Sequence, residues 1–341
     1  MSVTIKDVAK KAGVSPSTVS RVIAEHPRIS AKTSRKVREV MDELGYHPNM
    51  MAKSLVSKTT KTIGVILPRP AEELLLNFFF YEFMRGVMAQ LTRAGYDLLM
   101  AGGNNEREEL ETVTRLVRGG RIDGLLLLYS RIADPIIAFL HKEKVPFVLI
   151  GRSLDYENVL SVDNDNVQAA YDATKHLIAQ GQRRIGFVSG PTHLAMTQDR
   201  LAGYTKALAE AGLPFKQGWV VEGEFLLESG YRAMASIMSQ PEPPTALVVI
   251  DDFVAFGVLK GLAELGFRVP QDVAIVSFNN IALAELTMPP ITSVDIGTYQ
   301  LGYTASQMLL STILQEQIQP RQLIPHRLVI RESSLRTFFP V

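Results

Sequence analysis

Cysteine is absent from this sequence of 341 residues, which excludes a disulfide framework, a thiolate nucleophile and a cysteine-based metal site. Long hydrophobic runs are absent too. No apolar stretch approaches the ~18 residues that a membrane-spanning helix needs, and no signal-peptide pattern precedes the first charged residues. These absences predict a soluble, cytoplasmic protein that does not contact a membrane.

Patterns typical of catalysis and metal binding are missing as well. The six histidines show no i, i+4 pair and no carboxylates at metal-ligand spacing. The sequence has no dinucleotide-binding G-x-G-x-x-G after a strand, no phosphate-binding G-x-x-x-x-G-K and no G-x-S-x-G nucleophile elbow. Asp251 and Asp252 are adjacent carboxylates after an apolar run, a place that more often caps a helix and binds a polar ligand. We therefore expect no enzyme activity, no metal and no cofactor.

Charge is nearly balanced over the whole chain but unevenly distributed along it. The 36 Lys and Arg residues and the 35 Asp and Glu residues give a net charge of +1. Residues 1–62 alone carry a net charge of +7, and the remainder carries −6. A basic N-terminal segment on an acidic body predicts nucleic-acid contact confined to one end of the chain.

The N-terminal segment shows the start and stop signals of three short helices. Thr4 can cap a helix over Ile5–Ala12, and Ser15 can cap a second helix that opens with Pro16, a favourable first helical residue. A Gly-Val-Ser turn separates these two helices, and a third helix is predicted to end at Leu44. Two short helices joined by such a turn indicate a helix-turn-helix.

The composition changes twice along the rest of the chain. After a His-Pro pair comes a helical stretch too short to be stable alone, followed by polar and basic residues that indicate a hinge. From Thr62 onward, short apolar runs alternate with amphipathic helical stretches, which predicts parallel sheets covered by helices on both faces. The predicted division is a headpiece over 1–46, a hinge and linker over 47–61, a core over 62–334 and a tail over 335–341. The predicted strands are Ile63–Leu67, Tyr96–Ala101, Gly124–Tyr129, Phe147–Ile150, Arg184–Val188, Ala246–Ile250 and Val273–Phe278, and the predicted helices include Phe83–Ala94, Glu106–Arg118, Asn166–Gln180 and Arg200–Ala211.

Several segments, in order along nearly the whole chain, resemble the lactose-repressor/galactose-repressor family of bacterial transcription factors. The matching segments are Thr4–Ser15, Thr18–Val22, Leu44–Asn49, Ala52–Leu55, Thr62–Val65, Asp199–Tyr204, Asp252–Gly257, Val269–Val273 and Pro325–Arg327. The resemblance implies an all-α helix-turn-helix headpiece and an α/β periplasmic-binding-protein-like core of two doubly wound subdomains. It implies an N-subdomain of about 62–161 and 292–322 and a C-subdomain of about 162–291 and 323–334, joined by three crossovers.

The same resemblance implies a homodimer that binds a pseudo-palindromic, double-stranded DNA operator. Each headpiece would place its second helix in the major groove, where Arg21 can bond guanine O6 and N7. Residues 48–56 resemble the hinge helix of the family, and Leu55 matches the side chain that intercalates in the minor groove. The residues implied in DNA contact are Thr4, Ser15, Pro16, Ser17, Thr18, Ser20, Arg21, Asn49, Ala52, Lys53 and Leu55.

For the core, the resemblance implies an effector in the cleft between the subdomains. The expected contacts are Phe79, Phe80, Arg200, Phe225, Asp251, Asp252 and Asn279. Paired donors and acceptors with flat apolar faces suit a sugar, because its hydroxyls need polar partners and its C–H faces stack on aromatic rings. The run Leu76–Phe80 resembles the segment that maltose-responsive members carry, which suggests maltose or a similar glucoside. A purine would also stack on the aromatic rings, but one arginine with two carboxylates and an amide fits vicinal hydroxyls better than a flat base edge. Two departures are Asn279, where many members have Asp, and Arg152, a cationic group where others have an acidic one.

The sequence therefore predicts a transcriptional regulator, a repressor of sugar-utilisation genes whose operator affinity is controlled by a small sugar. One alternative is a global carbon-catabolite regulator controlled by a phosphorylated phosphocarrier protein. Such a partner needs basic residues for its phosphate, but Tyr299–Gln315, which matches part of the docking helix, contains no Lys or Arg. An alternative of another class is a sugar-binding transport protein, which would leave the headpiece unexplained.

Overall fold

The N-terminal part of the chain folds into a three-helix bundle with its own small core. The structure is a computed structural model that describes residues 3–24, 26–46, 59–67 and 76–335. The helices of the bundle are α1 (Ile5–Ala12), α2 (Pro16–Ile23) and α3 (Ala31–Leu44). Their buried side chains are all Val or Ala: Val8, Ala9, Ala12, Val19, Val22, Val37 and Val40. The helix-turn-helix that the sequence predicts is thus confirmed.

Local capping explains where these helices begin and end. The Asp7 carboxylate accepts a hydrogen bond from the backbone N–H of Thr4 at 2.9 Å. At the start of α2, Ser15 Oγ accepts one from the backbone N–H of Thr18 at 3.1 Å. Gly13 ends α1 at φ +68°, a left-handed conformation that glycine adopts without a Cβ penalty. Because each cap uses residues close in sequence, local signals set the helix boundaries of the bundle.

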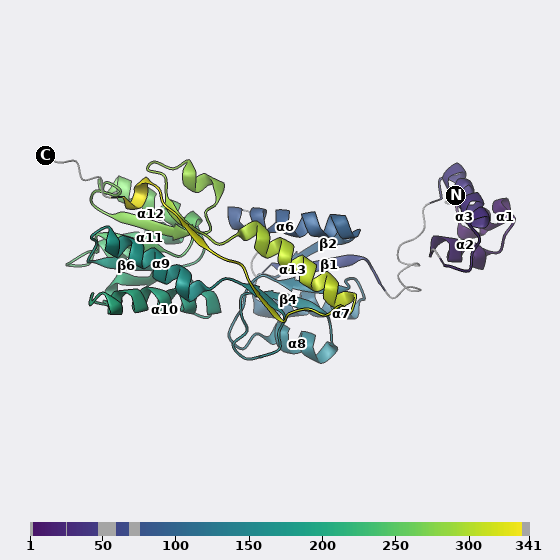
Figure 1. Ribbon diagram of the computed structural model, residues 1–341, viewed down its shortest axis with the longest axis horizontal. Helices are drawn as coiled ribbons and strands as arrows, with labels where there is room; N and C mark the ends of the chain where they lie inside the picture. Colours follow the sequence, from purple (N-terminus) through teal and green to yellow (C-terminus); the bar gives the residue numbers. More distant parts are fainter. Residues whose placement is uncertain (1–2, 25, 47–58, 68–75, 336–341) are drawn as a thin grey trace.

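The core consists of two six-stranded sheets, one in each subdomain (Figure 1). In the N-subdomain the strand order is β11-β5-β4-β3-β1-β2, and in the C-subdomain it is β12-β10-β9-β8-β6-β7. All neighbouring strands are parallel except β12, which is antiparallel to β10. The strands are β1 (Thr62–Leu67), β2 (Asp97–Gly102), β3 (Gly124–Leu127), β4 (Phe147–Ile150), β5 (Ser161–Asp163), β6 (Ile185–Ser189), β7 (Val220–Glu222), β8 (Ala246–Val249), β9 (Ala274–Phe278), β10 (Thr292–Asp295), β11 (Arg321–Leu323) and β12 (Arg327–Val329).

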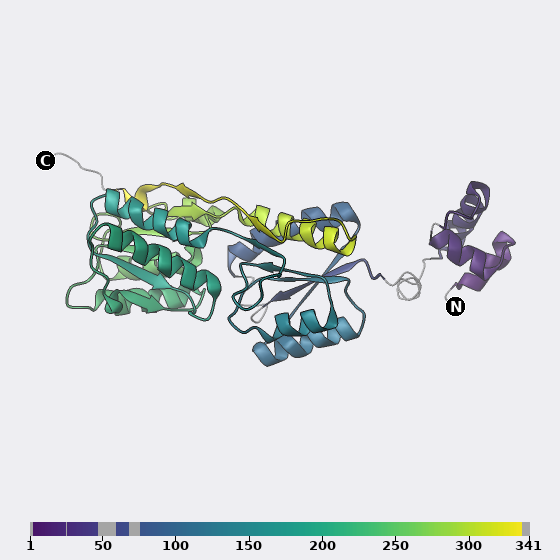
Figure 2. The same cartoon turned by 60° about the horizontal axis from the view of Figure 1, so that its bottom comes forward.

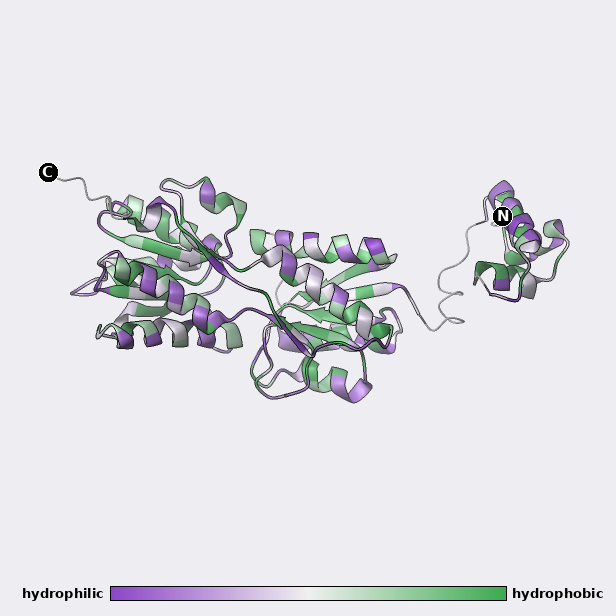
Figure 3. Cartoon of the chain, viewed as in Figure 1, coloured by the Kyte–Doolittle hydropathy of each residue, from purple (hydrophilic) through white to green (hydrophobic). Residues whose placement is uncertain are grey.

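Helices cover both faces of each sheet, as strand–helix alternation predicts. In the N-subdomain α6 packs beside α13, and α7 packs beside α8; in the C-subdomain the pairs are α9 with α10 and α11 with α12. Figure 3 shows strands that are largely apolar and helices that alternate between apolar and polar residues. The helices are α6 (Phe78–Ala94), α7 (Glu106–Arg118), α8 (Pro135–Glu143), α9 (Asn166–Ala179), α10 (Ala195–Glu210), α11 (Leu227–Met238), α12 (Asp252–Glu264) and α13 (Thr298–Ile313), with short 3-10 turns at Gln217–Trp219, Ala282–Glu285 and Glu332–Ser334.

The chain crosses between the subdomains three times, side by side (Figure 2). The crossings follow β5, β10 and β11, so the expected subdomain boundaries shift by a few residues. Asp163 belongs to the N-subdomain because β5 pairs with β4 and β11. Residues 292–295 belong to the C-subdomain, not the N-subdomain, because β10 pairs with β9. Leu323, which ends β11, likewise stays in the N-subdomain sheet. Strand pairing therefore corrects the boundaries that the family resemblance implied.

Two helices begin five residues earlier than predicted. Helix α6 begins at Phe78 because Asn77 caps it, its Oδ1 accepting from the backbone N–H of Phe79 at 3.0 Å. Helix α10 begins at Ala195, which places Arg200 in its second turn and not at its start. The short strands β5, β7, β10, β11 and β12 were not predicted, because none of them contains a continuous apolar run of the kind that marks the equally short β3, β4 and β8.

Part of the predicted DNA-binding set cannot be placed in the fold. The hinge over 48–56 lies outside the described residues, and so do Asn49, Ala52, Lys53 and Leu55. Within the described part of the chain, no helix combines the length and the apolar character needed to cross a bilayer.

Candidate functional site

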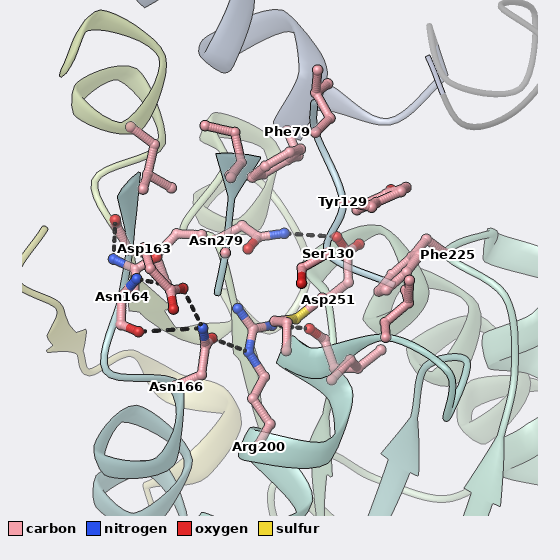
Figure 4. Close-up of a pocket in the computed structure, with 18 of the residues that line it drawn as sticks. Phe79, Tyr129, Ser130, Asp163, Asn164, Asn166, Arg200, Phe225, Asp251 and Asn279 are labelled. Atoms are coloured by element: carbon pink, nitrogen blue, oxygen red, sulfur yellow. Dashed lines mark hydrogen bonds between the residues drawn. The ribbon is translucent and has the colours of Figure 1, made fainter. Parts of the chain in front are cut away.

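A cavity lies between the two subdomains at the carboxyl ends of their strands (Figure 4). Residues 128–130 follow β3 and Gly151 follows β4, while Ile250 follows β8 and Asn279 follows β9. This edge is where open α/β sheets bind ligands, because the strand ends leave backbone and side chains pointing into the crevice. Six of the seven residues expected from the sequence line the cavity: Phe79, Phe80, Arg200, Phe225, Asp251 and Asn279.

Arg200 is the main hydrogen-bond donor of the cavity. Its side chain is buried, with 3% of its surface exposed. Nε donates to Asn166 Oδ1 at 2.9 Å and Nη1 donates to the carbonyl oxygen of Ile250 at 2.6 Å. The guanidinium also lies over the Phe278 ring, 4.1 Å from its centroid. No hydrogen bond joins Nη2 to another described residue, so this nitrogen is free to bind a ligand.

The charge of Arg200 survives its burial. Desolvation lowers the pKa of Arg200 to about 10, and the carboxylates of Asp251, Asp163 and Asp252 oppose this shift. A guanidinium with a pKa near 10 remains protonated at neutral pH. The cavity therefore presents a buried, fixed cation to a ligand, where a hydrogen bond to a charged donor is stronger than one in water.

Asp251 holds together groups from both subdomains. Its Oδ1 caps α12 by accepting from the backbone N–H of Phe253 at 2.6 Å. Its Oδ2 accepts from Nδ2 of Asn279 at 2.6 Å and from Nδ2 of Asn77, in the other subdomain, at 3.3 Å. Burial raises the pKa of Asp251, and the hydrogen bonds from Asn77 and the α12 backbone lower it. Since Asn279 donates to this carboxylate, its own Oδ1 is the atom left to accept from a ligand.

Asp252 does not line the cavity, which corrects the expectation that it contacts the effector. Its Oδ1 accepts from the hydroxyls of Ser277 and Ser293, and its Oδ2 accepts from the backbone N–H of Ile281 at 2.9 Å. These partners lie on or beside β9 and β10, so Asp252 ties the start of α12 to the sheet. Its carboxyl group is fully buried, and this burial raises the pKa of Asp252 to about 7.

Aromatic rings form one wall of the cavity (Figure 4). Tyr129 from the N-subdomain and Phe225 from the C-subdomain are stacked with centroids 6.0 Å apart. Phe80 packs edge-on against both Tyr129 and Phe79, at 6.2 Å and 5.2 Å. Phe78, the first of the three consecutive phenylalanines, is 41% exposed and does not line the cavity. Tyr129 was not singled out from the sequence, although its place at the carboxyl end of the predicted strand Gly124–Tyr129 is the signal that could have found it.

Three polar residues beside Arg200 were also missed by sequence reasoning. Asn166 connects Arg200 to Asp163, its Nδ2 donating to Asp163 Oδ1 at 3.1 Å. Asn164 lies in the first crossing, and its Nδ2 donates to the carbonyl oxygens of Ile296 and Ile324, each at 2.8 Å. Ile296 and Ile324 belong to the second and third crossings. One amide therefore joins all three crossings at the floor of the cavity.

The side chain of Arg152, the expected extra cation of the site, does not line the cavity either. It forms an ion pair with Asp199 across the cleft instead. In the described part of the chain, no group of His, Asp and Glu side chains could hold a metal ion. The site thus offers a buried guanidinium, amides, carboxylates and aromatic faces. Such groups can bind a polar ligand through hydrogen bonds and ring stacking.

The second helix of the bundle presents the residues expected to contact DNA. Ser15, Pro16, Ser17 and Arg21 are exposed, whereas Thr18 and Ser20 are half-buried. Val19 and Val22 point into the bundle core, so the polar side of α2 faces outward. Thr4 is exposed at the start of α1, where its hydroxyl donates to the Asp7 carboxylate.

Two family models match this chain. Residues 4–49 match the lacI family of bacterial regulatory proteins, and residues 174–334 match a periplasmic binding protein-like domain. These matches cover the helix-turn-helix bundle and most of the C-subdomain.

Curated relatives match over nearly the full length. The HTH-type transcriptional regulator MalR of Streptococcus pneumoniae is 38% identical over 96% of this chain and 99% of that protein. Catabolite control protein A of Priestia megaterium is 34% identical over 98% of this chain and 100% of that protein. The HTH-type transcriptional repressor PurR of Escherichia coli is 35% identical over 97% of this chain and 96% of that protein.

Solved structures agree with the architecture described above. The complex of the transcriptional regulator CelR with cellobiose is 33% identical, with a TM-score of 0.77 over 97% of this chain and 99% of that chain. The lac repressor dimer bound to operator and the anti-inducer ONPF is 27% identical, with a TM-score of 0.86 over 98% of this chain and 100% of that chain.

Proposed function

Because this chain belongs to the lacI family of bacterial regulatory proteins, we propose that it represses sugar-utilisation genes under the control of a small sugar. It is a DNA-binding transcription regulator with a helix-turn-helix headpiece and a ligand-binding core. The sugar occupies the cavity between the subdomains, and its presence shifts the population between two subdomain arrangements. Each arrangement positions the headpieces differently, which changes operator affinity.

The observation that carries the sugar assignment is the pairing of Arg200 with an aromatic wall in one buried cavity. Vicinal hydroxyls match the unpaired Nη2 of Arg200 and the Oδ1 of Asn279, and the C–H face of a sugar ring matches Tyr129 and Phe225. A purine would also stack on these rings. It offers a flat edge with few groups, which fits the polar residues on several sides of the cavity less well.

A glucose disaccharide such as maltose is the sugar that we propose. The structurally similar CelR binds cellobiose, which is a glucose disaccharide. The run Leu76–Phe80 supports the same class, because it contributes Asn77, Phe79 and Phe80 to the cavity lining.

We further propose that the chain binds a pseudo-palindromic operator as a homodimer, as the lac repressor neighbour binds its operator. One headpiece reads only a half-site, so two are needed for specific binding. The exposed apolar residues of α6 are the surface that we assign to pairing: Phe78, Tyr81 and Met88 are 41%, 65% and 45% exposed. Contact with DNA would use Arg21 on bases, and Ser15 and Thr18 near phosphates.

Two other functions fit the observations less well. Global carbon-catabolite regulation is suggested by the likeness to catabolite control protein A. Control by a phosphorylated phosphocarrier protein fits less well, because α13 carries no Lys or Arg to bind a phosphate. A transport protein would have no use for the helix-turn-helix headpiece.

Calorimetric titration of the full chain with maltose, cellobiose and guanine tests the sugar assignment. We expect binding of maltose, cellobiose or both, and no binding of guanine. Binding of guanine with silence to both sugars would overturn the proposal. Silence to all three would also overturn it and would favour control by a protein partner.

A further inference from the structure

Arg152 and Asp199 form an ion pair that spans the two subdomains. Arg152 follows β4 in the N-subdomain, and Asp199 lies in α10 of the C-subdomain (Figure 1). Arg152 Nη2 lies 2.6 Å from Asp199 Oδ1, and Arg152 Nε lies 2.8 Å from Asp199 Oδ2. This bidentate geometry fixes both the distance and the relative orientation of the two groups.

Neither side chain lines the cavity, yet each is the immediate neighbour of a residue that does. Gly151 precedes Arg152, and Arg200 follows Asp199. The ion pair therefore lies at the rim of the cleft, beside the site that the proposed sugar occupies. An effect of this pair on ligand affinity must act through the position of the subdomains and not through contact with the ligand.

Backbone hydrogen bonds join the subdomains at the same rim. The N–H of Ala195 donates to the carbonyl oxygen of Ser130 at 3.1 Å, and the N–H of Ile132 donates to that of His193 at 3.2 Å. The hydroxyl of Ser130 donates to the carbonyl oxygen of Arg152. The segment 130–132, Arg152 and the start of α10 thus form one continuous contact between the subdomains.

We propose that the Arg152–Asp199 ion pair is a latch that favours the closed arrangement of the subdomains and thereby sets effector affinity. Opening the cleft separates a carboxylate from a guanidinium that it binds through two hydrogen bonds. The Arg152 and Asp199 side chains are 33% and 14% exposed, so water solvates both charges once they part. The pair therefore biases the equilibrium without locking it, as a regulator that must switch requires. Its consequence for a sugar rests on the proposed function, but its effect on the subdomains does not.

Distance measurements between spin labels test the latch without any ligand. The chain contains no cysteine, so labels attach only to introduced sites such as Ala138→Cys on α8 and Ala209→Cys on α10, both exposed. Arg152→Glu places two carboxylates together and should shift the distance distribution toward longer values. The double variant Arg152→Glu with Asp199→Arg reverses the pair and should restore the original distribution. Lys216→Glu, which repels Glu242 within the C-subdomain, is the matched control and should leave the distribution unchanged.

Maltose affinity supplies the second measurement. Arg152→Glu should weaken maltose binding about tenfold, within the usual range for coupled sites, and the double variant should recover it. An unchanged distance distribution in folded Arg152→Glu, or a double variant that fails to restore it, would overturn the latch. If the original chain does not bind maltose, the distance measurements still decide the latch, and only the sugar assignment fails.

Discussion

Asn77 and Asp251 cap helices in different subdomains, and Asn77 Nδ2 donates a hydrogen bond to Asp251 Oδ2 at 3.3 Å. Asn77 caps α6 and Asp251 caps α12, so the positive ends of two helix dipoles converge on one buried carboxylate. Helix α6 carries the exposed apolar residues that we assign to dimer contact. The cavity is thereby connected to that helix through the Asn77 amide, in addition to the rings of Phe79 and Phe80 that line it.

Substitution of Asn77 should separate its two roles. Asn77→Ser keeps a good N-cap but is too short to reach Asp251, whereas Asn77→Ala loses the cap as well. We expect Asn77→Ala to be less stable than Asn77→Ser by about 1 kcal/mol in urea unfolding. Both should bind maltose more weakly by a similar factor, because both lose the bond to Asp251. Equal stabilities of the two variants would show that the cap contributes nothing.

Arg200→Ala should abolish the response to the effector and leave operator binding intact. Truncation of a buried charged group that hydrogen-bonds a ligand costs about 2–5 kcal/mol of binding energy, which corresponds to a loss of affinity of about 30-fold or more. Arg200→Lys should lose most of this affinity too, because an ammonium cannot reproduce the planar fork. Calorimetry gives the effector affinity, and fluorescence anisotropy with labelled operator DNA gives the operator affinity. Arg268→Ala, which breaks an exposed pair with Asp272, is the control and should change neither.

Asp252 should make stability fall as pH rises toward neutrality. Burial raises the pKa of Asp252 to about 7 in the folded chain, well above the ordinary value of an aspartate carboxyl. The folded state therefore holds a proton that the unfolded state has lost between about pH 4 and pH 7, so this contribution to stability is present at low pH and is lost over that window. Asp252→Asn keeps a neutral group of the same shape. The stability of the original chain relative to Asp252→Asn should thus be higher at pH 5 than at pH 7.5, measured by urea unfolding. A difference that is constant with pH would show that Asp252 titrates in its ordinary range.

Gly86→Ala should separate α6 from α13. A Cβ at Gly86 in α6 would lie 2.1 Å from the carbonyl oxygen of Tyr299 in α13. Likewise, a Cβ at Gly302 in α13 would lie 2.1 Å from the carbonyl oxygen of Phe83 in α6. Because backbone atoms cannot give way as a flexible side chain can, we expect a loss of about 3 kcal/mol in the free energy of unfolding. Ala89→Val, on the exposed side of α6, should cost well under half as much. Similar losses for both variants would argue against a close backbone contact.

Much of this protein was predicted from the sequence because the signals are local. In the headpiece, the caps at Thr4 and Ser15 and the spacing of apolar residues indicate where α1 and α2 begin and which sides they bury. Each of these signals involves residues only a few positions apart. Alternation of apolar runs and amphipathic stretches likewise indicates parallel sheets, although strands without a continuous apolar run, such as β5 and β11, were not predicted. Asp251 was expected in the site because it follows a predicted strand, where a parallel sheet binds its ligands, whereas Arg200 was expected there from the resemblance to the family.

Tertiary structure alone decided which side chains meet. Asp251 and Asp252 are neighbours in sequence, but successive residues at a helix start point in directions about 100° apart, so one faces the cavity and the other bonds to Ser277 and Ser293. Arg152 and Asp199 likewise meet only because two subdomains close on each other. The sequence by itself determined the elements and the residue types at their ends, since these follow from interactions within a few residues. The assignment of β10 to the C-subdomain and the bonds of Asn164 to Ile296 and Ile324 depend on strands brought together from distant parts of the chain, and only packing selects among the pairings that the local pattern allows.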